Sequence, residues 1–230
     1  MRTKVFISLI ACILLTGNLL AQEPPGWVNL GDLPEAWQIR DILEIPGINV
    51  LIACGYGSYH DSQIWRSTNG GQSWTKAVDT DSYTFRQLKR DSMSGNLWAV
   101  RDMSGSNTLY YSTDNGEIWT GVSSPFSNPQ VSGNTIEIID NFVYYGGTIA
   151  DPYNIALYRL NQSSLEWELV RAYPECNAIT QLKLHDGNLI VFARDKDESL
   201  IRVFSHTPAE LGKRVINLGK AKISTASTEE

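Results

Sequence analysis

Hydrophobic and polar positions along this chain alternate in short runs that predict β-strands. Apolar, β-branched and aromatic residues fill each run, and Gly, Asn, Asp, Ser or Pro bound it. Such runs are typical of strands separated by turns. None of them has the sustained 3.6-residue periodicity of an amphipathic helix. The pattern therefore predicts an all-β fold.

These runs recur with a period of about 47 residues, which the tryptophans make visible. Trp27, Trp74, Trp119 and Trp167 stand 47, 45 and 48 residues apart, and Val215 lies a further 48 residues along. Each period holds four predicted strands, a pattern typical of a β-propeller blade. We therefore predict about four four-stranded blades. The predicted strands are Ile39–Ile45, Asn49–Ala53, Ile64–Arg66 and one from Trp74; Phe85–Lys89, Leu97–Arg101, Thr108–Tyr111 and Ile118–Val122; Thr135–Ile139, Phe142–Tyr145, Ala156–Leu160 and Trp167–Val170; Ile179–Leu184, Leu189–Ala193, Leu200–Phe204 and Val215–Leu218.

Two units share a motif in the turn before their fourth strand. The first unit has Ser67-Thr68-Asn69-Gly70-Gly71-Gln72-Ser73-Trp74, and the second has Ser112-Thr113-Asp114-Asn115-Gly116-Glu117-Ile118-Trp119. Both resemble the Asp box, or BNR repeat, S-x-D-x-G-x-x-W, of β-propellers in the sialidase and sortilin-like superfamily, with asparagine replacing aspartate in the first unit. The third unit keeps only Trp167, and the fourth has lost the motif. The resemblance implies a secreted bacterial propeller, and such rings usually have six or seven blades.

The motif residues are expected to stabilise their turns. Serine and aspartate or asparagine side chains bond nearby backbone N–H groups, glycine adopts a positive φ, and tryptophan packs between blades. In Asp-box propellers these turns lie on the face opposite the active site. The resemblance therefore implies a structural role for Ser67, Asn69, Gly71, Trp74, Ser112, Asp114, Gly116 and Trp119.

Residues 1–21 have the pattern of a secretory signal peptide. Arg2 and Lys4 precede an apolar run of 11 residues, and the small residue Ala21 ends the segment. The run is shorter than the roughly 20 residues that span a bilayer. A lipoprotein signal ending at Cys12 is the alternative. We expect cleavage after Ala21 and a secreted, periplasmic or cell-surface protein without a membrane span.

The predicted organisation beyond the signal is one set of blades. Residues 22–219 form the blades, and residues 220–230 begin a further blade or a tail. Trp27–Leu30 is predicted to be an outer strand without a blade of its own. Two interpretations are open: a piece of a larger ring, or an arc of blades that needs a partner. The pattern leaves the oligomeric state undecided.

Composition and charge restrict the chemistry. The formal net charge is −6 without a basic tract, which argues against nucleic-acid binding because phosphate backbones attract clustered Lys and Arg. The three histidines lack the close spacing of a zinc site, and no nucleophile elbow or phosphate loop is present. We expect no metal and no cofactor. Cys54 and Cys176 can form a disulfide or remain buried thiols.

Polar and aromatic residues gather in the loops between blades and after each second strand. In propellers these loops build the ligand face, where aromatic rings stack on sugars and carboxylates bind hydroxyl groups. The same residue types also occur in ordinary solvated turns. The candidate binding residues are Tyr59, His60, Asp61, Asp81, Tyr83, Arg101, Asp102, Asp151, Tyr153, Arg194 and Asp195.

These observations predict a non-catalytic module that binds a glycan or an extracellular or surface protein through its loop face. One alternative is a glycoside hydrolase, sialidase-like or related, whose remaining blades are missing, since paired carboxylates serve glycoside hydrolysis. The chain lacks the Arg-Ile-Pro motif of sialidases. Another alternative is a scaffold, because propellers resembling photosystem II assembly factors use such repeats to hold partner proteins.

Overall fold

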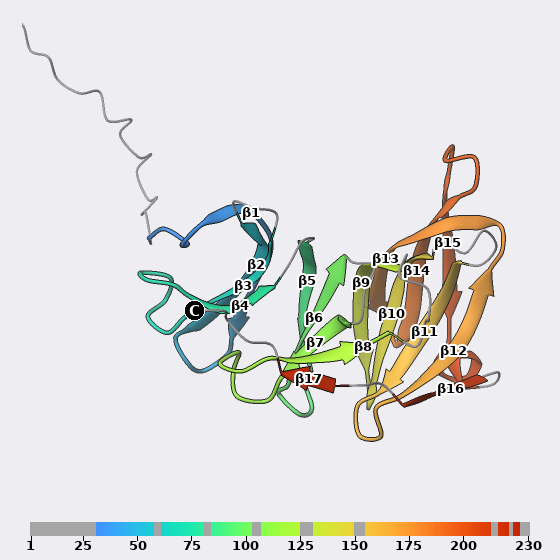
Figure 1. The fold of residues 1–230 in the computed structure, drawn as a ribbon. Helices are drawn as coiled ribbons and strands as arrows, with labels where there is room; N and C mark the ends of the chain where they lie inside the picture. The colour runs from blue at the N-terminus through green and yellow to red at the C-terminus, as the bar shows by residue number, and fades with distance from the viewer. Residues whose placement is uncertain are drawn as a thin grey trace, which may run out of the picture.

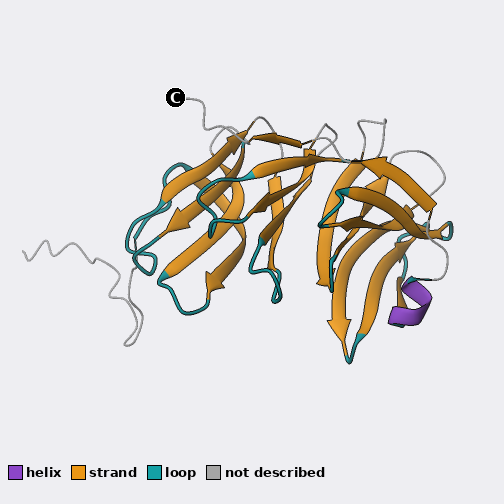
Figure 2. Cartoon of the chain, turned by 90° about the horizontal axis from the view of Figure 1, so that it is seen from below, coloured by secondary structure: helices purple, strands orange, loops and turns teal. Residues whose placement is uncertain are grey.

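The computed structural model describes residues 31–57, 61–80, 84–102, 107–124, 131–149, 155–212, 216–220 and 223–225. Most of these residues belong to four antiparallel sheets that follow one another along the chain (Figures 1 and 2). Within each sheet the strands of one blade follow chain order and are joined as hairpins, and two of the sheets also gain one strand from the C-terminal segment. The sequence prediction of an all-β fold built from propeller blades is confirmed.

Each sheet corresponds to one blade, numbered here 1 to 4. Blade 1 contains β1 (Ala36–Ile45), β2 (Val50–Gly57), β3 (Ser62–Ser67) and β4 (Thr75–Thr80). Blade 2 contains β5 (Thr84–Arg90), β6 (Leu97–Asp102), β7 (Asn107–Ser112) and β8 (Thr120–Ser123). Blade 3 contains β9 (Val131–Ile139), β10 (Phe142–Ile149), β11 (Ile155–Asn161) and β12 (Glu166–Tyr173). Blade 4 contains β13 (Cys176–His185), β14 (Asn188–Asp195) and β15 (Ile201–His206).

The C-terminal segment does not complete blade 4. After the short helix α1 (Pro208–Leu211), β16 (Ile216–Lys220) pairs antiparallel with β12, and β17 (Ile223–Thr225) pairs with β8. Figure 1 shows these two strands in red, running back along blades 3 and 2. The expectation that Val215–Leu218 forms the outer strand of the fourth blade was wrong. Among the described strands, blade 4 has three.

Helix α1 accounts for the direction that the chain takes after β15. Thr207 caps its N-terminus, and the Glu210 side chain accepts a hydrogen bond from the Thr207 N–H in return. Leu211 is buried in the core between blades 3 and 4. Arg159 of β11 donates to the Leu211 carbonyl at 3.2 Å. These contacts direct the chain from the end of β15 toward blade 3, instead of back along blade 4.

The hydrophobic core is divided among three junctions between consecutive blades. We call the side of a sheet that faces the next blade its forward face, and the other side its backward face. Because side chains alternate along a strand, blades 2 and 3 each supply apolar residues to two cores. The first core includes Ile52, Cys54, Ile64, Phe85, Leu88 and Trp119; the second includes Trp98, Val100, Leu109, Ile136, Tyr145 and Trp167; the third includes Tyr144, Leu157, Cys176, Ile179, Leu182 and Val191.

Both cysteines of this region are buried free thiols. Cys54 lies in the core between blades 1 and 2, whereas Cys176 lies in the core between blades 3 and 4. Blades 2 and 3 separate the two cores, so the two cysteines do not form a disulfide. Burial raises the pKa of the Cys54 thiol well above its ordinary value, which keeps this side chain neutral and apolar in character.

Candidate functional site

The candidate binding residues that the structure describes lie at one end of the blades, which we call the loop end. Here the second strands β2, β6, β10 and β14 finish and the third strands β3, β7, β11 and β15 begin. The structure describes five of the candidates, namely Asp61, Arg101, Asp102, Arg194 and Asp195. The other six, Tyr59, His60, Asp81, Tyr83, Asp151 and Tyr153, lie outside the described residues.

Arg101 connects blade 2 to blade 1 through a hydrogen bond. It is only 5% exposed, and its Nε donates to the Ser62 hydroxyl of blade 1 at 2.9 Å. Its Nη1 also reaches the Tyr110 hydroxyl at 3.5 Å. A guanidinium presents several donors in one plane, so a single side chain can join two neighbouring sheets. Arg101 therefore fixes the geometry of the loop end between blades 1 and 2.

Asp102, the next residue, is held within its own blade. Arg86 of β5 donates from Nε to the Asp102 carboxylate at 2.8 Å, and a second guanidinium nitrogen completes the ion pair. Both partners remain partly exposed at the loop end. Both guanidinium nitrogens bond the same carboxylate oxygen, Oδ2, and hold that oxygen in place.

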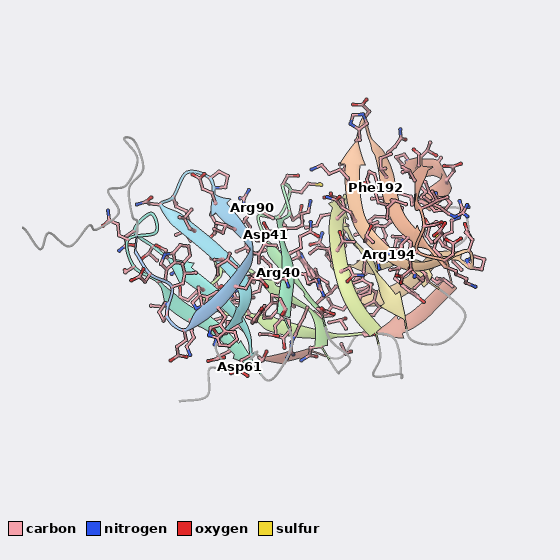
Figure 3. The ribbon with its side chains drawn as sticks, turned by 90° about the horizontal axis from the view of Figure 1, so that it is seen from above. Arg40, Asp41, Asp61, Arg90, Phe192 and Arg194 are labelled. Atoms are coloured by element: carbon pink, nitrogen blue, oxygen red, sulfur yellow. The ribbon has the colours of Figure 1, made fainter. Side chains whose placement is uncertain are left out.

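Arg194 and Asp195 have contrasting environments at the loop end of blade 4. Asp195 is 3% exposed, accepts from the Leu200 N–H at 3.2 Å, and shapes the turn between β14 and β15. The Arg194 guanidinium is largely exposed and lies 3.7 Å from the Glu198 carboxylate. Figure 3 shows Asp61 on blade 1, far from Arg194 on blade 4. The described candidates therefore belong to three separate blades and do not meet in one cluster.

A connected set of polar side chains crosses blade 1. The sequence pattern did not identify this set. Gln63 donates from Nε2 to Asp79 at 3.0 Å, and Lys76 contacts both Asp79, at 2.7 Å, and Glu35, at 2.8 Å. The hydrogen bond to Asp79 is the main reason that the pKa of Lys76 is raised. Asp79 lies in β4, and Gln63 sits inside an ordinary strand pattern.

Gln63 also lies against the end of β2. A Cβ on Gly57 would lie 2.6 Å from the Gln63 amide, so the end of the Gln63 side chain would have to shift to admit one. Gln63 is itself 2% exposed. Within the described part of the chain, its Oε1 has no hydrogen-bond partner. A buried acceptor without a donor is costly, so a donor group is expected at this position.

Two more buried polar atoms at the loop end lack a partner among the described residues. Thr80 is the last residue of β4, and Asn177 is the second residue of β13. The Thr80 hydroxyl and the Asn177 Oδ1 have no described hydrogen-bond partner. Together with Gln63 Oε1, these are buried atoms without a described hydrogen-bond partner at the loop ends of blades 1 and 4.

The opposite end of the blades holds the two motif turns, and their hydrogen bonds are nearly identical. The Ser67 hydroxyl donates to Asn69 at 2.9 Å and accepts from the Gly71 N–H at 2.9 Å. The Ser112 hydroxyl donates to Asp114 at 2.7 Å and accepts from the Gly116 N–H at 2.9 Å. The shared pattern shows that these side chains stabilise turns.

The Asp114 carboxylate closes its turn by accepting backbone N–H groups. It accepts from Glu117 at 3.1 Å and from Ile118 at 3.0 Å. Partial burial by itself raises the pKa of Asp114, but these hydrogen bonds outweigh it and the net shift is downward. Gly116 has φ +81°, and a Cβ there would lie 2.4 Å from the Ile52 side chain of blade 1. Glycine is therefore needed both for the turn and for the junction.

The repeated tryptophans occupy equivalent places but differ in their surroundings. Trp74 and Trp119 donate from Nε1 to the carbonyl of their own turn glycine, at 2.9 and 3.1 Å. Trp167 donates instead to the Ser123 carbonyl of blade 2 at 2.9 Å. Trp119 and Trp167 are completely buried in junction cores, whereas Trp74 stays partly exposed. Trp74 lies at the end of the arc, where no described blade covers it.

Comparisons with known proteins are consistent with this architecture. No protein-family description matches the chain, and no curated protein matches it. Among solved structures, an enzyme from Niastella koreensis described as GH74 has a TM-score of 0.53 and 19% identity; the match covers 79% of this chain and 30% of the enzyme. The computationally designed Ika4 protein has a TM-score of 0.47 and 14% identity, with 79% and 99% coverage. A nidogen/laminin complex has a TM-score of 0.42 and 12% identity, with 82% and 85% coverage.

The chain spans less than a third of the length of the GH74 enzyme, and at this identity the likeness concerns the fold alone. In the part of the chain that the structure describes, no helix is long and apolar enough to cross a membrane. The four consecutive antiparallel sheets and the shared fold lead to one conclusion: the chain is an all-β protein of the β-propeller type.

Proposed function

We propose that the protein is an exported, non-catalytic binding module that engages a glycan or an extracellular protein through its loop end. The observation that carries the proposal is Oε1 of Gln63, a buried acceptor at the loop end of blade 1 that has no hydrogen-bond partner among the described residues. An acceptor of this kind suits a sugar hydroxyl or a peptide N–H, because either group would remove the cost of an unpaired buried atom.

The arrangement of the charged groups also favours binding over catalysis. Asp102 is paired with Arg86, and Asp195 is committed to its turn. General acid–base chemistry on a glycoside needs two carboxyl groups facing one bond. Asp102 of blade 2 and Asp195 of blade 4 instead belong to separate blades, and each has a structural partner. A scaffold role for partner proteins uses the same surface and stays within the proposal.

We further propose that the two motif turns are Asp-box repeats and that residues 1–21 direct export. Their nearly identical hydrogen bonds support the first statement. The charge and hydrophobicity pattern of the N-terminal segment supports the second. N-terminal sequencing of the protein recovered from its native host tests export directly, because removal of the signal leaves Gln22 as the first residue.

The binding proposal is tested with purified protein on an array of sialylated and neutral oligosaccharides. We expect ligand retention without product release, and Asp61→Ala at the loop end should weaken retention several-fold. Asp186→Ala, which removes an 85% exposed carboxylate at the opposite end, is the matched control. Release of reducing sugar that one carboxylate substitution abolishes would instead establish the glycoside hydrolase alternative. Equal effects of the two substitutions would argue against the loop end as the binding surface.

A further inference from the structure

The three junctions between blades repeat one hydrogen bond. Asp41 of β1 accepts from the Leu88 N–H of blade 2 at 2.8 Å. Gln87 of β5 accepts from the Ile136 N–H of blade 3 at 2.8 Å. Thr135 of β9 accepts from the Leu182 N–H of blade 4 at 3.0 Å. Each blade therefore offers one acceptor forward and one N–H backward, always on its first strand.

Strand register identifies the equivalent residues at the two ends of the arc. Leu88, Ile136 and Leu182 pair with Ala99, Tyr145 and Val191 of the neighbouring strands, and Ile42 pairs in the same way with Ala53. The acceptor that precedes Leu182 is Gln181, which is exposed on blade 4. Among the described residues no blade precedes Ile42, and its N–H is bonded by its own neighbour, Asp41, at 2.9 Å. Blade 4 thus carries the equivalent acceptor, Gln181, and blade 1 carries the equivalent donor, the Ile42 N–H, of a fourth junction.

Apolar side chains on the end faces follow the same rule. Leu88, Ile136 and Leu182 are at most 3% exposed, whereas their equivalent Ile42 is 57% exposed. On the forward faces, Ile64, Leu109 and Leu157 are completely buried, whereas their equivalent Val203 is 60% exposed. Exposure of such residues at both ends of a packed array indicates a contact surface.

The two end faces lie at opposite ends of the arc. Figure 3 shows Asp41 on blade 1 and Phe192 on blade 4, with blades 2 and 3 between them. No hydrophobic core joins blade 4 to blade 1 in the described part of the chain. Residues 31–35 cover the outer part of the backward face of blade 1, where Trp65 donates to the Pro34 carbonyl at 2.9 Å. The part around Ile42 remains open.

We propose that a second copy of this chain completes the arc, with the forward face of blade 4 in one copy packed on the backward face of blade 1 in the other. Gln181 then accepts from the Ile42 N–H of the other copy, and Phe192 and Val203 cover Ile42. Two such contacts join two copies into a closed ring of eight blades, and closure leaves no end face exposed. The contact continues the junction that the chain already forms three times, and it is independent of the proposed ligand.

The test measures the mass of the purified chain, expressed from its full sequence, by light scattering from about 1 to 100 µM. We expect the mass of two copies. Val203→Lys and Ile42→Lys should each weaken self-association at least tenfold, because each places an uncompensated charge in the contact. Ile118→Lys is the matched control: Ile118 is 58% exposed on a turn of blade 2, away from both end faces.

A charge pair distinguishes this arrangement from other modes of association. In the double variant Ile42→Glu/Val203→Lys, the opposite charges meet only if blade 4 of one copy packs on blade 1 of the other, so association should recover relative to either single variant. The mass of one copy throughout the concentration range overturns the proposal, as it would if additional blades of a longer chain normally cover these faces. Equal effects of the control and the end-face variants, or no recovery in the double variant, overturn it as well.

Discussion

At the scale of single residues, the same position in the repeat carries different chemistry according to what its neighbours require. Asn69 and Asp114 occupy equivalent places and accept equivalent N–H groups, from Ser73 at 2.9 Å and from Ile118 at 3.0 Å. Asparagine adds a bond from Nδ2 to the Ser73 hydroxyl at 2.8 Å. An amide oxygen can therefore replace the carboxylate, because the turn depends on a hydrogen-bond acceptor and not on a negative charge.

This comparison predicts how the second turn tolerates substitution. Asp114→Ala removes the acceptor for the Glu117 and Ile118 N–H groups and should lower the free energy of unfolding by about 1–2 kcal/mol. Asp114→Asn keeps an acceptor, as Asn69 does in the first turn, and should lower it by less. Denaturant titration of the three proteins provides the measurement. A larger loss for asparagine than for alanine would contradict the structural role assigned to this side chain.

His206 predicts a dependence of stability on pH. Its ring nitrogen lies 2.7 Å from the Tyr173 hydroxyl in a buried site. Burial is the main reason that its pKa is lowered; nearby Arg171 adds to the shift and Glu210 opposes it. The unfolded chain therefore binds a proton before the folded one as the pH falls. Stability should decline below about pH 6.5, the ordinary histidine pKa, until the pH passes the folded value.

Thermal unfolding between pH 7 and pH 5 measures this effect. His206→Gln should flatten the pH dependence over this interval, because it removes the group whose pKa burial lowers. An unchanged slope in the His206 variant would show that other groups produce the dependence.

At the scale of elements, stability is concentrated at the junctions between blades. A single blade presents two apolar faces, so each sheet depends on its neighbours to bury them. The motif turn of blade 2 shows the coupling, because its Gly116 contacts Ile52 of blade 1 and Arg66 of blade 1 donates to the Asn115 carbonyl at 2.9 Å. Turn and junction are therefore formed by the same residues.

The tryptophans of equivalent turns should differ in their contribution to stability. Trp119→Ala removes a completely buried ring from the core between blades 1 and 2 and should cost about 3–5 kcal/mol. Trp74→Ala removes a partly exposed ring at the end of the arc and should cost clearly less. Denaturant unfolding at protein concentrations below self-association provides the comparison. Equal costs would mean that another segment covers Trp74 as completely as blade 1 covers Trp119.

At the scale of the whole molecule, the C-terminal segment ties the blades together. By pairing with β12 and then with β8, it extends blades 3 and 2 and covers their outer edges, which would otherwise present unpaired backbone groups. The outer edge of blade 4 receives no described strand, and the forward face of blade 4 carries exposed Val203. Added strands therefore cover the outer edges of blades 2 and 3, whereas no described strand covers the outer edge of blade 4. We propose that the second copy binds the forward face of blade 4.

The sequence by itself determined the class of the fold and most of its strands. Short apolar runs, the spacing of Trp74, Trp119 and Trp167, and two matching turns specify repeated four-stranded units, because strand alternation and turn chemistry are local properties. The roles of Ser112 and Asp114 followed from the same local chemistry. Five of the candidate binding residues lie near the loop end in the described part of the chain, and their role in binding stays a prediction.

Only the tertiary structure decided what those residues contact and where the C-terminal segment lies. The partner of β16 depends on α1 packing Leu211 between blades 3 and 4, a contact between distant segments that no local pattern encodes. Arg101 looked like a rim residue, yet it is buried against Ser62 of another blade. Gln63 showed no signal at all, because an amide in a strand becomes notable only when its burial and its missing partner are known.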